Sequence, residues 1–138
     1  MFRCKSPMAQ NSEKKIILFI DDESDQLFSI EQTLKHANKG YEFHGASSGK
    51  ECISLLKKGL QPDLILLDIM MPHKDGWELF DNLRDNPKWT NIPIIFLTAR
   101  TDKIAQKAGT FLGDDYLKKP VDERTLIESI EKVLDAHQ

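Results

Sequence analysis

The chain has 138 residues and a mass of 15.8 kDa, which is enough for one domain with a real hydrophobic core. Hydrophobic residues make up 40% and charged residues 30%, which is normal for a soluble globular protein. The formal net charge is −3 and no basic stripe is visible, which argues against a protein that binds nucleic acid by neutralising phosphates.

Three features bear on where the protein works. Residues 1–14 are polar and without period, so they predict a flexible tail that lacks the apolar core of a signal peptide. No apolar run is long enough to span a bilayer, so no membrane contact is expected. Two cysteines, Cys4 and Cys52, are too few for a disulfide framework. We therefore expect a cytoplasmic protein in which residues 15–138 form one domain.

The first third of the chain alternates strand and helix. Residues 16–20 (IILFI) form a short, continuous apolar run, which is typical of a strand covered on both faces. The acidic residues at 21–25 suit the first turn of a helix, and residues 38–40 end it. Residues 41–45 alternate in polarity and predict a second strand near the edge of a sheet.

The middle of the chain repeats this alternation. Ser48 and Glu51 have the spacing of a capping box and predict the start of a helix that ends at Gly59. The apolar run 64–67 predicts a third strand. Apolar residues recur at helical spacing over residues 77–84, which predicts a third helix.

The last third completes the pattern. Residues 92–98 predict a fourth buried strand, a short helix follows at about 102–108, and residues 115–118 predict a fifth strand. Asp122 begins a last helix with an apolar face. Five strands that alternate with five helices predict a parallel sheet with helices on both faces, a doubly wound α/β fold.

Polar side chains follow the predicted central strands. Asp21 and Asp22 follow the first strand, Asp68 the third, Thr98 ends the fourth and Lys119 follows the fifth. Ligands of open parallel sheets bind outside the carboxyl ends of the strands, so we expect these side chains to form one site. Three crowded carboxylates recruit a cation, and oxygen ligands favour Mg²⁺. With a hydroxyl and an ammonium, the set suits phosphoryl transfer to an aspartate.

Each residue alone has a more ordinary explanation. Asp21, Asp22 and Glu23 have the chemistry of helix caps, and Thr98 has that of a β-branched strand residue. A single Lys119 is most often a solvated charge, and Tyr116 a half-buried strand aromatic. The site prediction rests on the coincidence that all these polar residues lie at one rim of the sheet, the one formed by the carboxyl ends of its strands.

The chain resembles the response-regulator receiver domains of two-component signalling, of which CheY is an example. The resemblance covers about residues 15 to 136, and four motifs in order carry it: IDDES, LLDIMMPHKDGW, LTA and DDYLKKP. It implies a flavodoxin-like sheet with strand order 2-1-3-4-5.

The resemblance also implies a role for each matching residue. Asp68 would accept the phosphoryl group. Asp22 would bind Mg²⁺ directly, Asp21 would act through a water or assist, and Met70 would offer its backbone carbonyl to the metal. Thr98 and Lys119 would hold phosphoryl oxygens.

Partners and switching follow from the same resemblance. The phosphoryl donor would be the phosphohistidine of a sensor histidine kinase or histidine phosphotransfer protein. Movement of Thr98 would let Tyr116 turn inward and change the surface offered to an unknown protein target. The protein would be a signalling domain rather than a metabolic enzyme, either monomeric or dimerising on phosphorylation.

Three other functions are compatible with the fold. A haloacid-dehalogenase-like phosphatase places a second aspartate two residues after the first, where this chain has Met70. A flavin or nucleotide module needs phosphate-binding glycines or hydroxyls after an early strand, and G-x-G-x-x-G is absent. A pseudo-receiver that binds partners without being phosphorylated stays open. Gly113 and Val121 depart from the family pattern near the expected switching surface.

Overall fold

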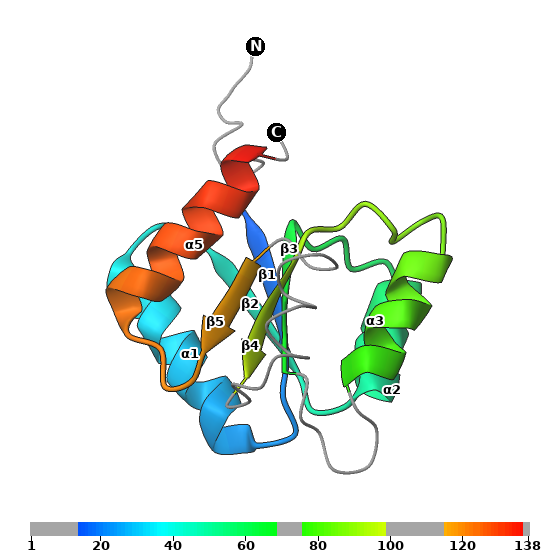
Figure 1. The fold of residues 1–138 in the computed structure, drawn as a ribbon, viewed down its shortest axis with the longest axis horizontal. Helices are drawn as coiled ribbons and strands as arrows, with labels where there is room; N and C mark the ends of the chain where they lie inside the picture. Colours follow the sequence, from blue (N-terminus) through cyan, green and yellow to red (C-terminus); the bar gives the residue numbers. More distant parts are fainter. Residues whose placement is uncertain (1–13, 69–75, 99–114, 137–138) are drawn as a thin grey trace.

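The structure, a computed structural model, describes residues 14–68, 76–98 and 115–136 (Figure 1). The elements in these ranges are, in chain order, β1 (Ile16–Ile20), α1 (Ser24–Ala37), β2 (Glu42–Ala46), α2 (Gly49–Lys57), β3 (Leu64–Leu67), α3 (Gly76–Asp85), β4 (Ile94–Thr98), β5 (Asp115–Lys118) and α5 (Glu123–Ala136). The five predicted strands are all present. The helix predicted at about 102–108 lies outside the described residues, which hold four of the five expected helices.

The strands form one parallel sheet in the order β2-β1-β3-β4-β5. This order and the parallel pairing confirm the predicted doubly wound α/β fold, with β2 at an edge as expected. Figure 1 shows the sheet between two helical layers, with α1 and α5 on one face and α2 and α3 on the other. Among the described residues, no helix is long and apolar enough to cross a lipid bilayer.

Each face of the sheet has its own core, because successive side chains of a strand point to opposite faces. On β1, Ile17 and Phe19 pack with α1 and α5, whereas Leu18 and Ile20 pack with α2 and α3. These four side chains are fully buried. A continuous apolar run, rather than an alternating one, is therefore what a central strand of this sheet requires.

The helix ends follow local side-chain chemistry. At α2, Ser48 Oγ accepts a hydrogen bond from Glu51 N–H at 3.1 Å, which confirms the predicted cap. Glu51 Oε1 reaches back to Ser47 N–H at 2.8 Å, one residue before the usual capping-box partner. At α5, the predicted cap Asp122 accepts from Thr125 N–H at 3.2 Å and binds the Thr125 hydroxyl. Both caps satisfy backbone donors that the first helical turn leaves without a helical partner.

The start of α1 bears on the alternative in which Asp21, Asp22 and Glu23 only cap that helix: Glu23 takes the cap position, and Asp21 and Asp22 do not. The helix begins at Ser24, and its N-cap residue is Glu23, whose side chain makes no capping hydrogen bond. Asp21 and Asp22 therefore precede the helix and lie at the end of β1.

Candidate functional site

Asp21 and Asp68 come together at the carboxyl-terminal rim of the sheet, where the strand arrows of Figure 1 point. The register pairs Ile20 of β1 with Leu67 of β3. Asp21 and Asp68, the residues that follow these two, therefore lie side by side. Asp68 N–H donates to the Ile20 carbonyl at 3.1 Å. Parallel pairing of two neighbouring strands thus sets one carboxylate beside another.

Three carboxylates form the acidic cluster of this rim. One oxygen from each of Asp21, Asp22 and Asp68 lies within 4.8 Å of the others. Asp21 is 0% exposed and Asp68 is 4% exposed, whereas Asp22 is open to solvent. Buried like charges at this range repel one another and are costly to desolvate. The cluster therefore needs a cation.

Lys119 supplies a positive charge at the centre of the cluster. Its Nζ lies 2.5 Å from Asp21 Oδ2 and 3.2 Å from Asp68 Oδ2, and its side chain is only 14% exposed. Burial lowers the pKa of Lys119, but the hydrogen bond to Asp21 and the negative charge of Asp68 outweigh burial and raise that pKa above its ordinary value. The ammonium is therefore charged at neutral pH. Lys118, by contrast, is exposed, as expected.

The Asp21 carboxylate is held at both oxygens. Oδ1 accepts from Glu23 N–H at 3.0 Å, and Oδ2 accepts from Lys119. These two contacts fix the orientation of the Asp21 carboxylate. The side chain of Asp22, the next residue, is exposed to solvent.

The cluster fits a hard divalent cation. Ligands on one octahedral Mg²⁺ lie at about 2.1 Å from the ion, so two of them are separated by about 3–4.2 Å. The carboxylate oxygens lie within 4.8 Å of one another, which is close to that spacing. Oxygen donors without sulfur or imidazole favour Mg²⁺ over softer metals.

The other predicted site residues are placed only in part. Thr98 ends β4 at the same rim, in register with Lys118, and its side chain lies outside the described residues. Met70 also lies outside them. Tyr116 is half-buried on β5, opposite Phe96, and packs against the core on the α2 and α3 face. Its predicted role as a switch stays a prediction.

Sequence reasoning missed the contact between Lys119 and Asp21. It assigned Asp21 to the metal and Lys119 to phosphoryl oxygens, whereas the structure joins them directly. The two residues are 98 positions apart, so no local pattern in the sequence signals the pair. Only the placement of β1 and β5 in one sheet brings them together.

The raised pKa of Lys119 predicts an alkaline loss of stability. Because the folded protein holds this proton more tightly than the unfolded chain, the stabilisation is complete below the ordinary lysine pKa of about 10.5 and disappears as pH rises through the folded value. Lys119→Arg keeps its charge throughout this range, so its unfolding free energy should fall less steeply. Urea unfolding from pH 9 to 12 measures both slopes.

Two other groups with raised pKa values also bear on this pH range. Burial raises the pKa of Tyr41 to about 12, with help from the charges of Glu131 and Asp135, and burial raises the pKa of Cys52 to about 12. Both contribute equally to wild type and variant, so the difference between the two slopes reports Lys119 alone. Identical slopes would contradict the expectation.

Comparison with known proteins agrees with this geometry. Residues 17–131 match the response regulator receiver domain family. The uncharacterized transcriptional regulatory protein YrkP of Bacillus subtilis (strain 168) is 40% identical over 111 residues. That alignment covers 80% of this chain and 45% of YrkP, so the chain spans less than half of that relative's length.

Solved structures show the same fold. A response regulator from Chloroflexus aurantiacus J-10-fl is 32% identical, with a TM-score of 0.80 over 89% of this chain and 99% of that one. The chemotaxis response regulator CheY4 of Vibrio cholerae is 26% identical, with a TM-score of 0.75 over 87% of this chain and 98% of that one. The family match spans most of the sequence and its fold is the one observed, so this chain belongs to the response regulator receiver domain family.

Proposed function

We propose that this protein is a phosphorylation-dependent signalling switch whose phosphoacceptor is Asp68. The donor is the phosphohistidine of a sensor histidine kinase or histidine phosphotransfer protein. One observation carries the proposal: a buried aspartate at the end of a central strand, with Lys119 and two further carboxylates beside it. A protein of this family is a signalling domain rather than a metabolic enzyme.

The proposed step is a transfer between two nucleophiles. An oxygen of the Asp68 carboxylate forms the new bond to phosphorus while the bond between phosphorus and the donor imidazole nitrogen breaks, and the imidazole keeps the electron pair. Mg²⁺, when bound, would supply positive charge that offsets the negative charge of the carboxylates and of the phosphoryl oxygens. Slow attack of water on the acyl phosphate restores Asp68.

The chain's own residues position this reaction. Lys119, already within 3.2 Å of Asp68, is placed to hold a phosphoryl oxygen as charge moves onto the new group. Thr98 is assigned a second contact to those oxygens, and Met70 a carbonyl ligand to the metal. Positioning and charge neutralisation account for most of the catalysis in this chemistry.

Asp21 and Asp22 differ in their exposure to solvent, and this difference supports different roles at the metal. Asp22 is exposed, so an incoming cation reaches its carboxylate directly. Both oxygens of Asp21 already accept hydrogen bonds from Glu23 N–H and Lys119, which favours contact with the metal through water. We therefore assign Asp22 as the direct ligand and Asp21 as the assisting one.

Tyr116 is the proposed link between the site and the partner surface. It is half-buried and lies three residues before Lys119, on the strand that pairs with β4. A partly buried aromatic ring has a more buried and a more exposed position available, and phosphorylation would shift the population between them through Thr98. The shift would change the surface around β5 and α5.

Relatives suggest more than one kind of output. YrkP is named a transcriptional regulatory protein, and the receiver domain of a signal transduction histidine kinase from Syntrophus aciditrophicus is 28% identical, with a TM-score of 0.76 over 88% of this chain and 91% of that one. We propose a cytoplasmic receiver over residues 15–138 whose target is a protein. Dimerisation on phosphorylation is one route to that target.

Intact mass after incubation with acetyl phosphate tests the proposal. We expect one phosphoryl adduct in the presence of Mg²⁺, none with a chelator, and none in Asp68→Asn. Asp63→Asn is a matched control, because Asp63 precedes the same strand at the opposite rim and should leave the adduct unchanged. A folded protein that binds Mg²⁺ but forms no adduct, even with a cognate donor kinase, would instead be a pseudo-receiver.

A further inference from the structure

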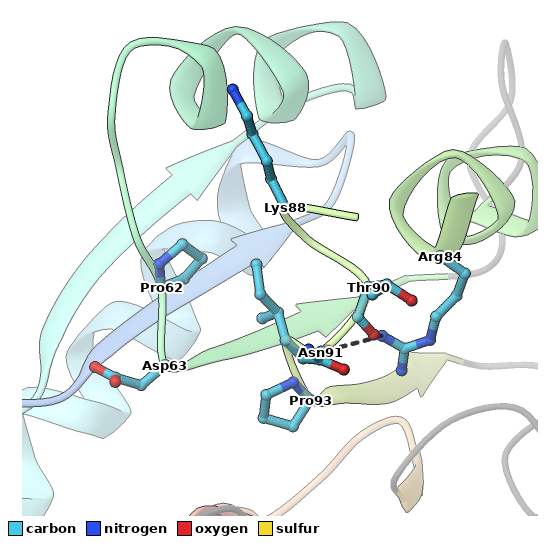
Figure 2. Close-up of a pocket in the computed structure, with 8 residues that line it drawn as sticks. Pro62, Asp63, Arg84, Lys88, Thr90, Asn91 and Pro93 are labelled. Carbon is cyan, nitrogen blue, oxygen red and sulfur yellow. Dashed lines mark hydrogen bonds between the residues drawn. The ribbon is translucent and has the colours of Figure 1, made fainter. Parts of the chain in front are cut away.

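A groove lies at the amino-terminal rim of the sheet, away from Asp68. One cavity of about 520 Å³ is formed by residues before β3, by Arg84 of α3 and by the loop that joins α3 to β4 (Figure 2). A second cavity of about 540 Å³ continues it toward the end of α2. Both cavities share Pro62, Lys88 and Ile92. We call the combined feature, lined by parts of residues 56–63 and 84–93, the amino-rim groove.

The walls of the amino-rim groove include apolar surface that is only partly covered. Leu60, Trp89 and Ile92 pack against the core on the α2 and α3 face, and each is only partly buried. Such surface gains free energy when a partner's apolar side chain removes it from water.

The charge of the amino-rim groove is opposite to that of the whole protein. Its described lining holds three bases, Lys57, Arg84 and Lys88, and one acid, Asp63, for a net +2, whereas the chain carries −3. Asp63 Oδ2 also accepts a hydrogen bond from Ile16 N–H at 2.8 Å, so that carboxylate is occupied in tying β1 to β3. The exposed Lys88 points from the loop toward α2 (Figure 2).

The loop that forms the groove is held in shape before any partner arrives. Arg84 Nη1 donates to the carbonyls of Thr90 and Ile92, each at 2.9 Å. Asn86 Oδ1 accepts from Lys88 N–H at 2.8 Å, and the Asn86 carbonyl accepts from Trp89 N–H at 2.9 Å. A preformed loop reduces the ordering cost of binding.

We propose that the amino-rim groove binds an acidic peptide segment of a partner protein. An apolar side chain of that segment packs on Trp89 and Ile92, and its carboxylates pair with Lys57 and Lys88. The groove precedes β3 and Asp68 follows it, and four residues of strand span about 13 Å. The segment can therefore bind while the carboxyl-terminal rim is occupied.

Fluorescence anisotropy with a fluorescein-labelled peptide Glu-Glu-Leu-Phe-Glu-Glu tests the proposal. We expect saturable binding below about 1 mM that weakens as salt is raised. The double variant Lys57→Glu/Lys88→Glu should weaken binding by at least about tenfold, because like charges then face the peptide. Lys50→Glu is the matched control: Lys50 is exposed on the same helix as Lys57 but does not line the groove.

Two further peptides separate the proposal from general charge attraction. Lys-Lys-Leu-Phe-Lys-Lys should not bind, and Glu-Glu-Ser-Ser-Glu-Glu should bind at least about tenfold more weakly than the first peptide. Equal binding of all three, an equal loss in Lys50→Glu, or no binding up to about 1 mM would each overturn the proposal.

Other occupants give distinct results. Sedimentation that shows a dimer lost in Lys57→Glu/Lys88→Glu would make the occupant a second copy of this chain and overturn the peptide assignment. Displacement of the acidic peptide by a short oligonucleotide at equal charge concentration would make the occupant a nucleic acid and would also overturn the peptide assignment. The peptide assay uses unphosphorylated protein, so its outcome is independent of the proposed phosphorylation of Asp68.

Discussion

Lys119→Met should lower the free energy of unfolding by about 3–5 kcal/mol, because it leaves two buried carboxylates without their shared cation. Asp21 is 0% exposed and Asp68 is 4% exposed, so bulk water solvates neither carboxylate well in the folded protein. Urea unfolding at pH 7 without divalent cations measures the loss. Lys118→Met is the matched control, since its exposed neighbouring side chain should change stability by less than about 0.5 kcal/mol.

A double variant identifies the cause of that loss. Asp21→Asn removes one of the repelling charges, so Lys119→Met/Asp21→Asn should be more stable than Lys119→Met alone. Mg²⁺ should stabilise Lys119→Met more than wild type, because the cation then replaces a missing charge. A loss below about 1 kcal/mol, with no recovery in the double variant, would show that the pair behaves like an exposed salt bridge.

Lys119→Met should also slow phosphorylation by acetyl phosphate by about 100-fold, as the loss of one group that holds developing charge usually does. The initial rate of adduct formation, read by intact mass in saturating Mg²⁺, measures the effect. The comparison is made at a temperature where the variant is folded by circular dichroism. An unchanged rate would remove Lys119 from the proposed site while leaving its structural role intact.

The second large effect lies in the core. Phe96→Ala should destabilise the protein by about 3–5 kcal/mol, because it opens a cavity beneath the sheet and removes a large buried ring. Phe96 is 0% exposed on β4, and its ring centroid lies 5.3 Å from that of Phe80 at an interplanar angle of 44°. The Arg84 guanidinium lies 5.0 Å from the Phe80 centroid on the same face of the sheet.

Phe28 offers a matched control for this substitution. It is 63% exposed on α1, so Phe28→Ala should change the free energy of unfolding by less than about 0.5 kcal/mol. Urea or thermal unfolding of both variants gives the comparison. Similar losses in the two would mean that burial does not govern stability at these positions. A loss near 1 kcal/mol in Phe96→Ala would mean that α3 collapses into the space.

Much of the fold could be predicted from the sequence because its signals are local. The runs at 16–20 and 64–67 are apolar at every position, and both are central strands covered on two faces. The pair Ser48 and Glu51 predicted where α2 begins, because capping needs only neighbours along the chain. Strand boundaries were less well predicted: the fourth strand begins at Ile94 rather than at residue 92.

The sequence by itself determined that several acidic and basic side chains follow the strands of a parallel sheet, and so lie at one rim. Only the tertiary structure decided which of them meet. Asp21 is buried and bonded to Lys119, whereas its neighbour Asp22 is exposed. The alternation of side chains along a strand does not predict this difference, because both residues lie beyond the end of β1. The amino-rim groove likewise depends on two loops that are distant in sequence. Local patterns set secondary structure, whereas contacts between distant residues depend on the order and register of the strands.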